Sequence, residues 1–148
     1  MSENFPLQKL LDLAHERTDD AARRLGELIG AEQEDDRKLT LLRQYRDEYQ
    51  ARFMDAAREG IGPDAWRNFS AFIGRLDEAI EQQQRIVAQA RDRTAAGQQA
   101  WIAERNRMKA FDALSQRHER QQARKEAKRD QTLTDEHAAK LGRNRDDG

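Results

Sequence analysis

The segment Gly60-Ile61-Gly62-Pro63 decides the fold, because it is the one strong break in the interior of an otherwise helix-forming chain of 148 residues. Proline lacks an amide N–H and its ring clashes with the preceding helical turn, so prolines are rare inside helices. The only other proline is Pro6, near the start. Since glycine allows the positive φ of a tight turn, the sequence predicts two long helices joined at 60–63.

Each of the two runs carries an apolar stripe with the alternating four- and three-residue spacing of a coiled coil. The first stripe comprises Leu7, Leu11, Ala14, Thr18, Ala21, Leu25, Leu28, Glu32, Asp35, Leu39, Leu42, Arg46, Tyr49, Phe53 and Ala56. The second comprises Trp66, Phe69, Ile73, Leu76, Ile80, Gln83, Val87, Ala90, Thr94, Gly97, Trp101, Glu104, Met108 and Phe111. The predicted fold class is all-α, a long antiparallel two-helix coiled coil or helical hairpin.

The position of the turn also predicts the register of the hairpin. Residues that face each other across the seam should have numbers that sum to about 122. Side-chain sizes match in this register, because large residues oppose small ones: Trp101 opposes Ala21, Leu25 opposes Gly97, and Phe53 meets Phe69. We expect a single hairpin, with helix 1 over about 5–59, the turn over 60–63, helix 2 over about 64–130 and a flexible end over about 131–148.

Composition and charge favour a cytoplasmic binding protein over an enzyme. Charged residues make up 37% of the chain and the mean hydropathy is −1.12, so the apolar stripe suits exposed helices better than a globular core. There is no cysteine, no secretory signal pattern and no glycine-rich phosphate turn. The three histidines, His15, His118 and His137, are widely spaced. We therefore expect no catalytic residue, no cofactor and no metal.

The second helix should extend past the first by about 30 residues, judged from the helical rise. This segment begins with a basic run that suits an acidic protein surface. Nucleic acid is a weaker candidate, because Glu119 and Glu126 interrupt the run and no aromatic residues alternate with it. The basic run comprises Arg117, Arg120, Arg124, Lys125, Lys128 and Arg129.

Near the turn, apolar residues also occupy g positions, which lie beside the seam rather than in it. In an antiparallel pair g faces g, so these side chains gather on one flank. An exposed aromatic patch is costly unless something covers it. The covering could be a partner protein or a second copy in a four-helix dimer. With the adjoining edges of the seam, the flank comprises Leu42, Tyr45, Tyr49, Phe72, Leu76 and Ala79.

Five segments carry a resemblance to a known family. They are Phe5-Pro-Leu-Gln-Lys-Leu-Leu-Asp-Leu-Ala, Asp20-Ala-Ala-Arg-Arg-Leu-Gly-Glu-Leu, Leu41-Leu-Arg-Gln-Tyr-Arg-Asp-Glu-Tyr, Arg67-Asn-Phe and Lys109-Ala-Phe-Asp-Ala-Leu. Together they resemble the FliJ family of flagellar type III protein export. The resemblance runs from about Phe5 to Ala139, and its most specific part is Leu-x-x-Tyr-x-x-x-Tyr with the aromatic-rich segment 66–80.

The resemblance implies a soluble stalk of the export apparatus, similar to the coiled coil of the γ subunit in rotary ATP synthases. It implies that the end with both termini, where the basic run lies, enters the ring of the export ATPase FliI. The flank of six residues near the turn would engage the gate protein FlhA, and family members also escort export chaperones. Such a protein is peripheral to the inner membrane at the flagellar base. Where the family pattern can show a histidine, this chain has Gln83, and Lys38 stands at another polar position of that face.

Two other functions fit parts of the pattern. A generic coiled-coil scaffold or homodimer without an ATPase partner would use the g flank as its own interface. A basic helix that binds nucleic acid is the third. A stalk is expected to be monomeric in isolation, so the mass in solution separates the first two functions.

Overall fold

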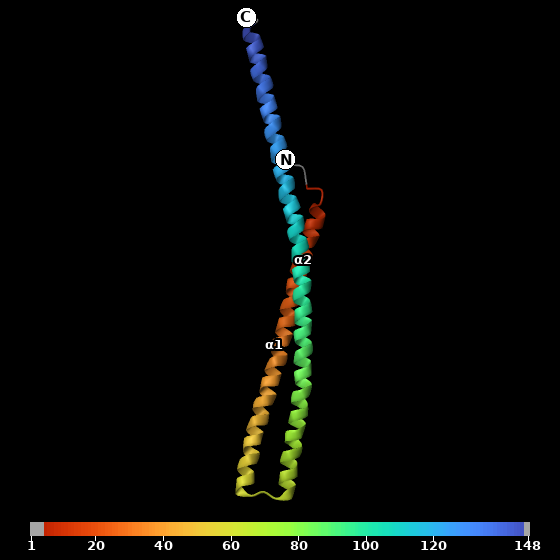
Figure 1. Cartoon of the computed structure of the whole chain (residues 1–148), viewed down its shortest axis with the longest axis vertical. Coiled ribbons are helices and arrows are strands. Elements are labelled where there is room, and N and C mark those ends of the chain that lie inside the picture. Colours follow the sequence, from red (N-terminus) through yellow and green to blue (C-terminus); the bar gives the residue numbers. More distant parts are fainter. Residues whose placement is uncertain (1–4, 147–148) are drawn as a thin grey trace. The chain divides into compact units, whose positions relative to one another are not determined.

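The computed structural model describes residues 5–146, which form two helices, α1 (Gln8–Glu59) and α2 (Pro63–Asp146) (Figure 1). The helices contribute to two compact parts. One part spans 20–102 and contains the turn, and the other joins 5–19 with 103–146. Within 20–102 the two helices run antiparallel, which confirms the predicted all-α helical hairpin.

The turn forms where the sequence predicts it and for the predicted reason. Gly60 has a φ of +94°, and its N–H donates to the carbonyl of Ala57 at 3.3 Å, which ends α1. A residue with a side chain would be strained at this positive φ, whereas glycine is not. Pro63 occupies the first position of α2, where its missing N–H has no partner to lose. The Trp66 N–H then donates to the Gly62 carbonyl at 3.0 Å.

The part over 20–102 has a narrow core that follows the predicted stripe. Its stripe residues are buried or half-buried apart from Trp66, which is 51% exposed beside the turn. Gln83 Nε2 donates across the seam to the Asp35 carbonyl at 2.9 Å, and Thr94 Oγ1 reaches the Leu28 carbonyl at 3.4 Å. Thr94 and Leu28 are partners in the predicted register, and the long Gln83 side chain reaches one helical turn beyond its predicted partner, Leu39.

The part that joins 5–19 with 103–146 packs a shorter seam. Its buried α1 residues are Leu11, Ala14 and Thr18, and the rings of Phe5 and His118 lie 5.6 Å apart. One oxygen of Glu104, Oε2, is buried without a hydrogen bond and lies 3.6 Å from Arg107 Nη1. From 123 to 145 every side chain is exposed.

Both predicted helix ends shift in the structure. α1 begins at Gln8 rather than near 5, since Pro6 precedes the first turn and the Gln8 N–H donates to the Phe5 carbonyl at 3.0 Å. α2 was expected to end near 130, but it continues to Asp146. Side-chain bonds one turn apart accompany this extension, among them Gln131 to Asp135 at 3.0 Å. Residues 147–148 of the predicted flexible end lie outside the described residues.

Neither described helix is long and apolar enough to cross a membrane.

Candidate partner-binding surfaces

Six aromatic rings form an unbroken series of contacts next to the turn. Successive centroids are separated by 4.8 Å, 5.3 Å, 5.4 Å, 4.3 Å and 6.2 Å. Aromatic pairs at such distances add to the free energy of simple burial. Because the contacts alternate between α1 and α2, they fix the two helices against each other here. We call this series the aromatic ladder, and in order it comprises Trp66, Phe53, Phe69, Tyr49, Phe72 and Tyr45.

The aromatic ladder is buried in the middle and exposed at its ends. Phe53 is 9% exposed, whereas Tyr45 is 51% exposed. Tyr49 and Phe72 are half-buried, and both of their rings pack against the Tyr45 ring. A rigid, half-supported tyrosine is a common anchor in protein interfaces, since it offers contact area at little cost in conformational entropy.

The six residues predicted for the gate contact differ in exposure: five are exposed or half-buried, and Leu76 is buried. It brings Tyr45, Tyr49 and Phe72 into direct contact, and it leaves Leu42 and Ala79 half-buried beside them. Leu76 is only 8% exposed, so its side chain belongs to the packing between the helices.

Sequence reasoning missed Leu41, which is 58% exposed. It lies one helical turn before Tyr45 and therefore on the same face of α1. Its heptad position, c, adjoins g on the helix surface. A search for apolar residues at c positions as well as g positions would have identified Leu41.

Of the two polar positions on this face, Gln83 is 9% exposed and bonded across the seam, so it serves the packing of the hairpin. Lys38 is exposed.

The two flanks of the hairpin over 20–102 differ in charge. Within these described residues two ion pairs join the helices, Arg91 with Asp36 at 3.3 Å and Arg46 with Asp77 at 2.8 Å, and in each pair the aspartate occupies an e position. The hydrogen bond from Arg46 to Asp77, together with the negative charge of Asp77, raises the pKa of the Arg46 guanidinium. Opposite charges therefore meet on the e flank.

On the other flank, the g positions between Arg24 and Arg52 and between Ala65 and Ala100 carry no acidic residue. We call this surface the basic–apolar flank. Its g positions are Arg24, Ala31, Lys38, Tyr45 and Arg52 on α1 and Ala65, Phe72, Ala79, Ile86, Arg93 and Ala100 on α2.

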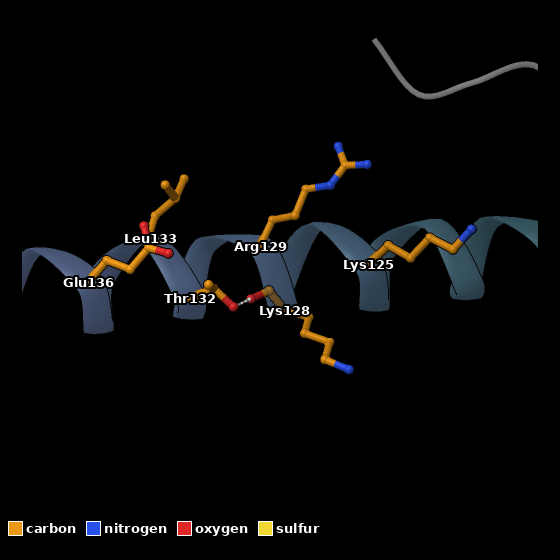
Figure 2. A pocket seen from close by; sticks show the side chains of 6 residues that line it. All are labelled: Lys125, Lys128, Arg129, Thr132, Leu133 and Glu136. Atoms are coloured by element: carbon orange, nitrogen blue, oxygen red, sulfur yellow. Dashed lines mark hydrogen bonds between the residues drawn. The ribbon is translucent and has the colours of Figure 1, made fainter.

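The basic run of α2 forms one face of a helix. At 3.6 residues per turn, its six basic side chains cover about half of the helix circumference. Glu119, Glu126 and Asp130 lie on the opposite side, so they do not interrupt the basic face as the linear sequence suggested. All six basic residues are exposed. Figure 2 shows part of this face, where Arg129 and Leu133 project to one side and Lys128 to the other.

No group of three or more histidine and acidic side chains that could hold a metal ion is found among residues 5–146. The surfaces described above are suited to contact with other proteins.

Comparison with known proteins fixes the family. Residues 2–147 match the model of a family described as "Flagellar FliJ protein". The chain belongs to the FliJ family. The FliJ protein of Salmonella typhi is 31% identical over 138 residues, which are 93% of this chain and 94% of that protein. The FliJ protein of Escherichia coli strain K12 is 30% identical over 138 residues, which are 93% of this chain and 94% of that protein. As a member of the FliJ family, the protein is a non-catalytic component of flagellar type III export.

A solved structure shares the fold. The chain resembles a putative YscO homolog, CT670, from Chlamydia trachomatis, with a TM-score of 0.55 and 16% identity. The similarity covers 95% of this chain and 96% of that one. At this level of identity the likeness concerns the helical fold.

Proposed function

We propose that this FliJ-family protein is a stalk that couples the ring of the export ATPase FliI to the membrane gate protein FlhA, and that it escorts export chaperones. It would act on the cytoplasmic side of the inner membrane at the flagellar base. The observation that carries the proposal is the exposed end of the aromatic ladder. Tyr45 is about half exposed to solvent and lies within the segment that matches the family model. It occupies a g position, beside the seam rather than in it.

The basic face of α2 supports the other half of the proposal. It belongs to a segment whose side chains are exposed from 123 to 145, so this segment has no packing role in the described chain. A helix with one basic face suits a partner with acidic side chains, and such contacts depend on salt. We assign the ATPase contact to Arg117, Arg120, Arg124, Lys125, Lys128 and Arg129.

The gate contact is tested with Tyr45→Ala and the cytoplasmic domain of FlhA. If Tyr45 is an anchor, its loss should weaken binding by about 2 kcal/mol, roughly thirtyfold. Helix content should stay near wild type, and the free energy of unfolding should fall by only about 1 kcal/mol, because the half-exposed Tyr45 ring loses its contacts with Tyr49 and Phe72. Titration calorimetry and circular dichroism measure the two quantities.

Met54→Ala is the matched control. Met54 is 49% exposed on α1, but it lies at a b position, away from the basic–apolar flank. It should bind the gate domain like wild type. Wild-type binding by Tyr45→Ala would refute the assignment of the gate contact to this flank.

A further inference from the structure

A groove lies on the basic–apolar flank at the end remote from the turn. Its volume is about 370 Å³, and all of its lining residues belong to the part over 20–102. Its floor is apolar and its two charged lining residues are Arg24, from α1, and Arg93, from α2. No acidic side chain of the described residues lines it. The lining residues are Ala21, Arg24, Leu28, Arg93, Ala96, Gly97 and Ala100.

Gly97, one of the lining residues, packs closely against α1. A Cβ atom placed there would lie 2.6 Å from Leu28 Cδ1 and 3.7 Å from Leu25 Cδ1. The glycine therefore lets α1 and α2 approach each other without a side chain rising between them. Small residues on the α2 side leave room above this contact for another helix. A third helix could follow the groove with its own small apolar edge.

The charged residues at the groove indicate what kind of helix would bind there. Within residues 5–146, neither g-position arginine at the groove, Arg24 or Arg93, forms an ion pair, whereas neighbouring Arg23 pairs with Asp20 at 3.0 Å. Arg24 and Leu28 also line an adjoining hollow on α1, where the carboxylates Asp20 and Glu27 lie, but neither carboxylate lines the groove itself. An incoming helix with a carboxylate on each side of its apolar edge would meet one arginine on each margin.

We propose that this groove binds an amphipathic helix of a partner protein whose apolar edge is bordered by acidic residues. The site is separate from the gate contact at Tyr45, because it shares no lining residue with the aromatic ladder. A second copy of the chain is a poor occupant through this same flank, since the flank offers no acidic g residue to pair with Arg24 and Arg93.

The proposal is tested with two synthetic helical peptides of about 21 residues, roughly 30 Å long as helices. Both carry alanine and leucine along one edge. One has glutamate on either side of that edge, and the other has lysine at the same positions. The full-length protein should bind the glutamate peptide, and the lysine peptide should not bind measurably.

The combined variant Arg24→Gln and Arg93→Gln should weaken binding of the glutamate peptide by about tenfold or more. Ala100→Leu, which fills the groove from an exposed position, should do the same without removing charge. The matched control is Arg43→Gln with Arg85→Gln, which removes two exposed arginines elsewhere in the same part. It should bind like wild type, and so should Tyr45→Ala.

Four outcomes would overturn the proposal. The glutamate peptide could fail to bind the wild-type protein, or both double variants could weaken it equally, which would indicate diffuse attraction. Duplex DNA could bind as tightly and be lost with the same two arginines, which would indicate a nucleic-acid surface. A mass that rises with concentration and falls in Arg24→Gln with Arg93→Gln would make a second copy the occupant.

Discussion

At the scale of single residues, two glycines in the interior of α2 have opposite surroundings. Gly97 faces Leu28 and Leu25, whereas a Cβ at Gly74 would meet nothing within 4 Å. Gly97→Leu should therefore overpack the seam and lower the free energy of unfolding by about 1–3 kcal/mol. Denaturant melts measure this loss.

Gly74→Leu is the control for the change at Gly97. It should raise the free energy of unfolding by about 0.5–1 kcal/mol, because leucine is a far better helix former than glycine and the site is open. Equal shifts for the two variants would mean that the helices do not approach closely at Gly97.

The residues of the seam could be predicted one by one, because they follow the alternating four- and three-residue spacing of the apolar stripe. The pairing of Leu25 with Gly97 and of Phe53 with Phe69 follows from the turn position alone. The role of Leu76 was not predictable in this way. A seam position can keep an exposed edge or lose it, and only the neighbouring side chains decide that it is 8% exposed.

At the scale of the helices, the length of α2 was underestimated. The residues after 130 have no apolar stripe, so the prediction lost its main signal there. They do contain local hydrogen-bond partners, such as Thr134 Oγ1 to the Asp130 carbonyl at 2.8 Å, and no proline. The charge pattern of α2 also became clear only on the helix, where acidic and basic residues separate onto opposite sides.

This separation gives a sharp test of the ATPase contact. Reversing the charge of Arg117, Arg120 and Arg124 should abolish stimulation of the FliI ATPase and leave the melting temperature almost unchanged, because exposed charges contribute little to folding. Raising the salt concentration should weaken stimulation by the wild-type protein in the same direction.

The acidic side of the same segment supplies the control. Reversing Glu119, Glu126 and Asp130 changes the net charge by the same amount in the opposite sense, on the opposite face of α2. This variant should stimulate the ATPase like wild type. If both variants abolish stimulation, the contact is not confined to the basic face.

At the scale of the whole molecule, the basic–apolar flank that we propose as a partner-binding surface is poorly suited to self-association. In a two-fold dimer through the basic–apolar flank, the basic g residues Arg24, Lys38, Arg52 and Arg93 would lie against a flank that is itself basic and has no acidic g residue to pair with them. Such juxtaposition of like charges costs several kcal/mol in a closed interface. The stalk function therefore fits this surface better than the homodimeric scaffold does.

Light scattering on a size-exclusion column decides between the two. The expected mass is that of the single chain, 17.2 kDa, at low salt, where repulsion across the flank is strongest. High salt should leave this mass unchanged if the flank is reserved for other proteins. A stable mass of twice that value, lost in Tyr45→Ala, would instead show that the aromatic patch closes a dimer, and the gate contact would have to lie elsewhere.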